Sequence, residues 1–213
     1  MSKPNSASRP PPPARRLVVG VTGASGAAYA VRFVELAVRA GREVALVVTR
    51  PGRLVLADEA DLAGTADAPD FAPLWPKSIL AHISYTPAER LDAPPASGSF
   101  DAEAVVIIPC TMNTAAAIAH GLASNLVQRA ARVALKEGRP LVLVPRETPM
   151  TAVDLENLAH LASAGAAVIP AMPAFYHRPR SVGDLVDFVV AKVLARIGIE
   201  HDLNVRWPGC LER

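Results

Sequence analysis

The chain has 213 residues, of which 51% are hydrophobic, 20% are charged and only 5% are aromatic, a balance that excludes a disordered or fibrous protein. The net charge is +2, and residues 1–16 supply four positive charges and no acid, so the remainder carries −2. That charge argues against a general nucleic-acid binder, and no apolar run reaches the roughly 18 residues that a membrane span needs.

The two cysteines and the N-terminal residues indicate where in the cell the protein is expected. Cys110 and Cys210 stand far apart and outside any metal-ligand spacing, which argues against a disulfide framework and a metal site. Residues 1–15 are rich in Pro and Ser and lack the apolar stretch of a secretory signal. We therefore expect an extended leader over 1–15, one domain over 16–207, a tail over 208–213 and a cytoplasmic location.

Short apolar runs alternate with helical patterns along the body of the chain. Patterns typical of buried strands fall at 17–21, 43–49, 104–108, 140–144 and 167–169, and the last three are expected to break at Pro109, Pro145 and Pro170. Helical patterns fall at 27–40, 54–62, 114–121, 125–137, 153–164 and 181–197. Residues 63–100 look irregular, with short elements near 79–84. This alternation predicts a single α/β domain with an open, doubly wound, mostly parallel sheet.

The loop after the first predicted strand has the spacing of a ligand-binding turn. Gly20, Gly23 and Gly26 follow the pattern G-x-x-G-x-x-G, which matches neither the dinucleotide fingerprint nor a P-loop. The second predicted strand ends in Thr49-Arg50 rather than in an acid, which suits a mononucleotide phosphate better than an NAD ribose. A purely structural glycine turn is the alternative.

Three further loops add polar groups at the same predicted edge of the sheet. The third strand leads into Thr111–Thr114, either neutral ligand contacts or an ordinary helix cap. The fourth leads into Arg146-Glu147, either a phosphate ligand with a proton acceptor or a structural ion pair. The fifth leads into Tyr176-His177, either site residues or core packing. Together these loops indicate a pocket for a flat, phosphorylated heterocycle and a second anion.

Longer segments carry a family resemblance. They read TGASG (22–26), APPASGS (93–99), PCTMNT (109–114), RAARVALKEGRPLVLVPRETP (129–149), VDLENL (153–158) and PAMPAFYHRPRSVGDLVDFVVAKVL (170–194). The chain resembles the UbiX/Pad1-type flavin prenyltransferases. That resemblance implies a Rossmann-like fold of flavoprotein type and a metal-independent transfer of a dimethylallyl group from dimethylallyl monophosphate to reduced FMN. It also implies a homododecamer with shared active sites and a UbiD-type decarboxylase that receives the prenylated FMN.

The resemblance also implies residue roles. The expected FMN contacts are Gly23, Ala24, Ser25, Thr49, Thr111, Met112, Asn113, Thr114 and Arg129. The expected contacts with the prenyl phosphate are Lys136, Arg146, Glu147, Tyr176 and Lys192, with Trp207 near the site. Ser25, Glu59 and Glu147 would assist proton movements. The chain departs from the family where Leu91 stands in place of an aromatic residue that would wall the prenyl group.

Two other functions remain open from the sequence. A flavin-dependent cysteine decarboxylase would share the fold and the 109–114 turn, but it needs a histidine after the first helix, and no histidine precedes His82. A non-catalytic FMN carrier would bind FMN without turnover.

Overall fold

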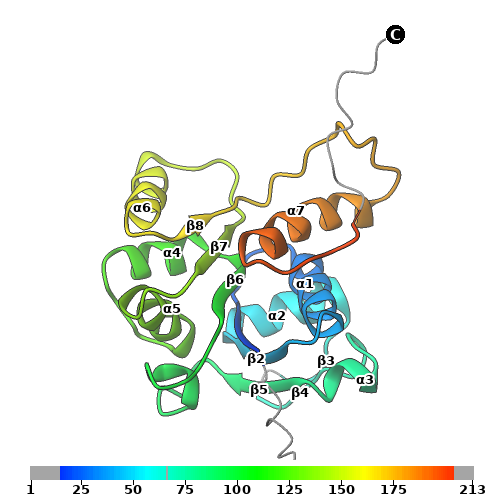
Figure 1. Ribbon diagram of the computed structural model, residues 1–213, viewed down its shortest axis with the longest axis horizontal. Helices are drawn as coiled ribbons and strands as arrows, with labels where there is room; N and C mark the ends of the chain where they lie inside the picture. Colours follow the sequence, from blue (N-terminus) through cyan, green and yellow to red (C-terminus); the bar gives the residue numbers. More distant parts are fainter. Residues whose placement is uncertain (1–14, 66, 204–213) are drawn as a thin grey trace, which may run out of the picture.

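The computed structural model describes residues 15–65 and 67–203, and a parallel sheet forms its centre (Figure 1). Over the described residues the sheet has six strands in the order β5-β2-β1-β6-β7-β8. Their bounds are β1 Arg16–Val21, β2 Glu43–Val48, β5 Ile83–Pro87, β6 Ala104–Cys110, β7 Leu141–Pro145 and β8 Ala167–Val168. A separate antiparallel pair joins β3 (Ala63–Gly64) to β4 (Pro69–Asp70). The predicted single-domain, doubly wound parallel fold is confirmed.

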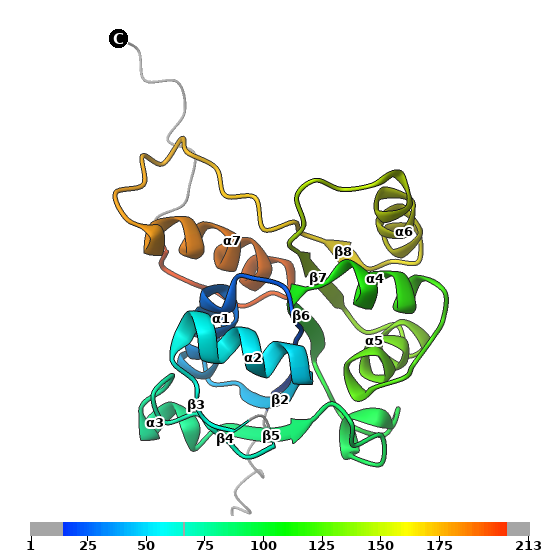
Figure 2. The same cartoon turned by 180° about the vertical axis from the view of Figure 1, so that it is seen from behind.

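Two layers of helices cover the sheet, as Figures 1 and 2 show from opposite sides. One layer holds α1 (Ala27–Arg39), α2 (Arg50–Ala60), the short α3 (Lys77–Leu80) and α7 (Val182–Arg196). The other holds α4 (Met112–Ala119), α5 (Leu126–Lys136) and α6 (Ala152–Ser163). Alternate strand residues face the two layers: Leu17 and Val19 join the first core, and Val18 joins the second. Burial on both faces explains why the strands read as continuous apolar runs.

The strand order reverses between β1 and β6. From β1 the chain moves outward through β2 to β5, and it then returns to the other side of β1 to build β6, β7 and β8. In sheets of this kind the crevice for a ligand opens at the carboxyl ends of the strands where the order reverses. The loops after β1 and β6 therefore lie at the edge where a ligand is expected.

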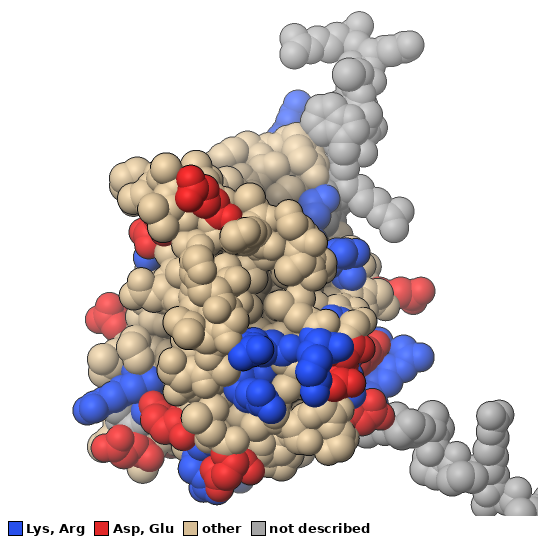
Figure 3. Space-filling model, turned by 90° about the vertical axis from the view of Figure 1, so that its left-hand side faces the viewer, with Lys and Arg blue, Asp and Glu red and all other residues tan. Residues whose placement is uncertain are grey.

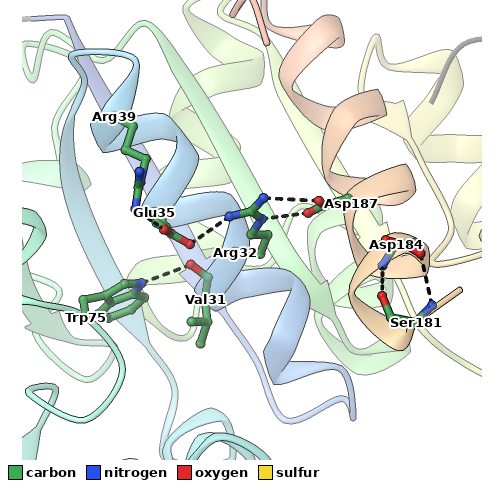
Figure 4. Close-up of polar contacts among 8 residues, drawn as sticks. All are labelled: Val31, Arg32, Glu35, Arg39, Trp75, Ser181, Asp184 and Asp187. Carbon is green, nitrogen blue, oxygen red and sulfur yellow. Dashed lines mark hydrogen bonds and ion pairs between the residues drawn. The ribbon is translucent and has the colours of Figure 1, made fainter. Parts of the chain in front are cut away.

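The layer of α1 and α7 is tied together by charge (Figure 4). The Arg32 guanidinium of α1 donates from Nε to Asp187 Oδ1 of α7 at 2.7 Å and from Nη2 to Oδ2 at 3.2 Å. A two-pronged arginine–carboxylate pair fixes orientation as well as distance. At the start of α7, Ser181 and Asp184 form a capping box, so both the beginning and the middle of this helix are anchored.

Several predicted boundaries were wrong. Residues 83–87, which were predicted to be irregular, form the edge strand β5. Because this strand is partly exposed, its sequence lacks the continuous apolar run by which a buried strand is recognised. The strand predicted to break at Pro109 continues to Cys110, with a cis Ile108–Pro109 bond and a shift of register against β7. Pro145 likewise ends β7 rather than following it.

Two helices begin earlier than the apolar pattern suggested. The α2 helix starts at Arg50 because Thr49 accepts a cap hydrogen bond from Gly52, and α4 starts at Met112 because Thr111 caps it in the same way. Within the described residues, no helix is long and apolar enough to cross a membrane. Residues 1–14 and 204–213, with the predicted leader, tail and Trp207, lie outside the described residues.

Candidate active site

The loop after β1 is closed by a carboxylate from α2. Glu59 Oε2 accepts hydrogen bonds from the backbone N–H groups of Gly26 at 2.7 Å and Ala27 at 2.9 Å. These are among the first N–H groups of α1, which have no partner within the helix. The anion that the α1 N-terminus favours is therefore supplied by the protein itself in this chain.

The ionisation of Glu59 follows from its surroundings. Burial opposes its charge, but hydrogen bonds from Ser25, Gly26 and Ala27 and the positive charge of Arg146 outweigh that effect and lower its pKa. A carboxylate at neutral pH beside the Ser25 hydroxyl can accept a proton or hold that hydroxyl in place.

Arg146 brings the end of β7 to the same loop. Its Nε donates to the backbone oxygen of Ser25 at 3.1 Å. Ser25, Glu59 and Arg146, three predicted site residues far apart in the sequence, thus converge. Glu147 follows directly and accepts from the Thr148 N–H at 3.3 Å, and among the described residues it forms no ion pair with Arg146. The structural ion pair that the sequence left open is not formed.

The ends of β1 and β6 are joined by a hydroxyl that the sequence analysis did not single out. Thr22, which is 1% exposed, donates from Oγ1 to the Pro109 oxygen at 2.9 Å and accepts from the Thr111 N–H at 2.8 Å. This contact sets the spacing of the two loops at the point where the strand order reverses. A threonine placed directly after a buried strand was the available signal.

The predicted flavin contacts in 111–114 serve partly as a helix cap. Thr111 Oγ1 accepts from the Thr114 N–H at 3.2 Å and donates to Thr114 Oγ1 at 3.0 Å, and Met112 and Thr114 are buried. Asn113 is exposed at the start of α4. Thr49 similarly caps α2 and lies 3.3 Å from the oxygen of Val21. Among the described residues, the side chain of Asn113 and the N–H groups of Met112 and Asn113 are therefore left to meet a ligand.

The glycine loop is packed tightly within the chain. A Cβ on Gly23 would collide with the Cβ of Pro51 at the start of α2, and Gly26 has a φ of 118°. Close packing and backbone conformation thus account for both glycines. The structural turn and the ligand loop are compatible readings, since the same packing buries Ala24 and leaves Ser25 exposed at the edge of the sheet.

Cys110 lies beside this loop but is chemically inert. It is fully buried, and burial raises the pKa of its thiol to about 12. Within the described residues no group of three or more His, Cys, Asp or Glu side chains is placed to hold a metal ion.

Arg129 and Lys136 lie at opposite ends of α5: Arg129 is in the first turn, which the Leu126 N–H ties to the oxygen of Ala88 just after β5, and Lys136 is in the last turn. Arg129 donates to the oxygen of Ala96 at 3.0 Å, and Lys136 lies 3.0 Å from Glu137 with 67% of its side chain exposed. Lys136 ends α5 just before β7 begins, so it lies at the opposite edge of the sheet from Arg146. Figure 3 views the side of the molecule where α4, α5 and α6 lie and shows a compact group of Lys and Arg side chains on a largely uncharged face.

Tyr176 and Lys192 come together at α7. The Tyr176 ring lies 5.7 Å from the Phe188 ring, and Lys192 Nζ lies 5.2 Å from the centroid of the same ring. One chain therefore presents two groups of predicted site residues, one around Ser25 and Arg146 and one on α7, while Trp207 lies outside the described residues.

Comparisons with known proteins identify the family of this chain. The model of the Flavoprotein family matches residues 5–194. The flavin prenyltransferase UbiX of Pseudomonas aeruginosa is 45% identical over 200 residues, covering 90% of this chain and 93% of its own. This chain belongs to the UbiX family of flavin prenyltransferases.

Two solved structures of similar proteins support the assignment to that family. The crystal structure of AnUbiX (PadA1) in complex with FMN and dimethylallyl pyrophosphate has a TM-score of 0.79 and 34% identity, covering 92% of this chain and 98% of its own. The dodecameric FMN-dependent UbiX-like decarboxylase of Escherichia coli has a TM-score of 0.80 and 38% identity, covering 91% and 100%.

Proposed function

We propose that this protein is a flavin prenyltransferase that joins the dimethylallyl group of dimethylallyl monophosphate to reduced FMN. The observation that carries the proposal is the convergence of Ser25, Glu59 and Arg146 where the strand order reverses, in a chain of the UbiX family. Prenylated FMN made in this way would serve a UbiD-type decarboxylase.

The residues present fit FMN. The exposed amide of Asn113, the N–H groups of Met112 and Asn113 and the hydroxyl of Ser25 are neutral donors and acceptors that suit a heterocycle edge and its ribityl chain. Thr49, whose hydroxyl caps α2, would contribute by packing beside the ligand. Arg129 offers a cation for the phosphate. When bound, reduced FMN supplies the electron-rich carbon and nitrogen that accept the prenyl group.

The protein's share of the reaction is electrostatic and concerns proton transfer. As the allylic C–O bond of the donor breaks, negative charge develops on the leaving phosphate, and Arg146, Lys136 and Lys192 can stabilise it. Glu147, next to Arg146, would take up the proton that is released when the new bond has formed. Glu59 holds the Ser25 loop and keeps a negative charge beside it.

Residues from more than one copy would complete the site. Within one chain Lys136 lies at the opposite edge of the sheet from Arg146, and Tyr176 and Lys192 form a separate group on α7. Exposed apolar side chains on α6 and on the 169–181 loop, including Leu155, Met172 and Phe175, suit contacts between copies. We propose a homododecamer, as in the E. coli relative, with sites shared between subunits.

Anaerobic incubation of the purified protein with reduced FMN and dimethylallyl monophosphate tests the proposal. Mass spectrometry of the flavin should show the mass of prenylated FMN. A flavin that binds but stays unchanged would identify a carrier and overturn the proposed activity. The decarboxylase alternative is tested in a separate incubation with a peptide that ends in cysteine and with oxidised FMN, which accepts the two electrons that this reaction releases. The loss of CO₂ from that peptide would equally overturn the proposal.

A further inference from the structure

Three aromatic rings meet where the 169–181 loop joins α7. The His177 ring stacks on Phe188 with centroids 5.4 Å apart and an interplanar angle of 12°. Tyr176 meets both rings edge-on, at 5.8 Å from His177 and 5.7 Å from Phe188. Offset stacking and edge-to-face contacts are the arrangements that aromatic pairs favour. Since aromatic residues make up only 5% of the chain, this cluster is a concentrated use of them.

The Phe188 ring is the fixed member of the cluster. It is 8% exposed, and the residue before it, Asp187, is held by the Arg32 guanidinium of α1. The helix that carries it is capped by Ser181 and Asp184 (Figure 4). Lys192, one turn further on, places its ammonium 5.2 Å from the centroid of the same ring. Tyr176 and Lys192, the two residues proposed to bind the donor phosphate, therefore both contact the fixed ring of Phe188.

His177 is held in this cluster without hydrogen bonds from the described residues. Both ring nitrogens are shielded from solvent, and neither has a hydrogen-bond partner. A buried polar atom with no partner is a cost and not a source of stability. Asp184 at the start of α7 lies close enough to interact with the imidazole by charge, but no hydrogen bond joins them among the described residues. Ring stacking on Phe188 is therefore the direct contact that holds the imidazole, and the imidazole in turn supports one edge of Tyr176.

We propose that His177 is a positioning residue for the prenyl donor: its ring, stacked on Phe188, holds Tyr176 in the orientation in which it meets the donor phosphate. The inference rests on the proposed function for the identity of the donor. It assigns His177 no proton transfer and no contact with FMN. The role belongs to the flat ring and not to its nitrogens.

Two substitutions at one position separate ring from nitrogen. His177→Phe keeps a flat ring that stacks on Phe188, so the KM for dimethylallyl monophosphate should stay within about twofold of wild type. His177→Ala removes the ring, and the same KM should rise at least about tenfold because a small misplacement of a substrate ligand is costly. FMN affinity should be unchanged in both. Equal defects in the two variants would overturn the proposal, since they would show that the nitrogens are engaged.

Phe188→Leu tests the ring on which His177 stacks. It should raise the donor KM at least as much as His177→Ala, because it removes the ring that both Tyr176 and Lys192 contact. Phe71→Leu is the matched control, since Phe71 packs in a distant aromatic cluster with Trp75 and Tyr85. A similar rise in KM for that control would show that the effect comes from a general loss of stability. It would reject the proposed role of Phe188 in supporting Tyr176 and Lys192.

A readout independent of turnover keeps the two proposals apart. Crystal structures of the oligomeric FMN-loaded variants should show Tyr176 displaced from Phe188 in His177→Ala and unmoved in His177→Phe. If the wild type makes no prenylated FMN, the proposed function fails while this comparison still judges the ring contacts. If the wild type is active but Tyr176 keeps its place in His177→Ala, the positioning role of His177 is rejected while the proposed function stands.

Discussion

At the scale of single residues, the charge around Ser25 decides what the site can do. Arg146 and Glu147 are adjacent in the chain, but their contacts divide between two tasks: Arg146 reaches the Ser25 backbone, and Glu147 stays within its own loop. A cation and a carboxylate that do not neutralise each other remain available to a phosphate and to a proton.

Glu147→Gln tests the proton role. The amide has the size of the carboxylate but does not take up a proton, so turnover should fall by about 10²–10⁴-fold while FMN stays bound. Rates of prenylated-FMN formation under anaerobic conditions, set beside an FMN titration, provide the measurement. Wild-type turnover in this variant would remove Glu147 from the chemistry.

Glu59 should make the stability of the α1 N-terminus depend on pH. Its pKa is lowered in the folded protein, so its contribution is present above its unfolded pKa and is lost as the pH falls through the folded value. Glu59→Ala removes a helix cap and should cost about 1 kcal/mol at pH 7. Thermal unfolding of both proteins from pH 7 to pH 3 should show the difference shrinking with acid; a constant difference would contradict this role.

At the scale of elements, the site depends on how two strand ends are held together. The hydroxyl of Thr22 satisfies the Pro109 oxygen and the Thr111 N–H, and it thereby joins β1 to β6 and to the cap of α4. The Glu59 carboxylate does the same for α2 and α1. The loops are therefore positioned by contacts between elements and not by their own sequence.

Thr22→Val should loosen this junction. The variant keeps the shape of the side chain but leaves the Thr111 N–H without its partner, whereas the Pro109 oxygen still accepts from the Thr22 N–H at 3.3 Å. An N–H group that loses its partner in this way costs about 1–3 kcal/mol. Denaturant unfolding measures the loss, and Thr65→Val, which removes a hydroxyl contact in an exposed turn, should change stability by less than about 0.5 kcal/mol. Equal losses in the two variants would argue against a special role for the junction.

At the scale of the whole molecule, the distribution of site residues points to assembly. Arg146 and Glu147 lie at the carboxyl edge of the sheet, whereas Lys136 ends α5 at the amino edge. The cations of α5 point outward, where a second copy can meet them. This separation supports the proposal that a single chain carries parts of more than one site.

Subunit mixing tests this arrangement. Lys136→Ala and Glu147→Gln should each be nearly inactive when assembled alone. If the two residues act in one site but come from different copies, random co-assembly should restore about a quarter of wild-type activity per site, since each half comes intact from one copy in two. Lys136→Ala mixed with itself is the control, and no recovery in the mixed oligomer would place both residues in the same chain's site.

Much of this architecture could be predicted from the sequence for a local reason. Buried parallel strands need apolar side chains on both faces, so residues 17–21 and 43–49 can be recognised as strands from their apolar runs. The polar loops that bind a ligand are then expected directly after them. The segments 129–149 and 170–194, which resemble the flavin prenyltransferases, indicated flavin chemistry, and the comparisons confirm this at the level of the family.

The tertiary structure alone decided how those loops are used. The half-exposed β5 carries no strong pattern, and only pairing with β2 shows it to be a strand. Glu59 stands 33 residues from the Gly26 N–H that it caps, and Lys136 is separated from Arg146 by the length of the sheet although only ten positions divide them. Sequence patterns record what a residue needs from its near neighbours and from burial, whereas contacts between distant elements depend on packing that no short stretch encodes.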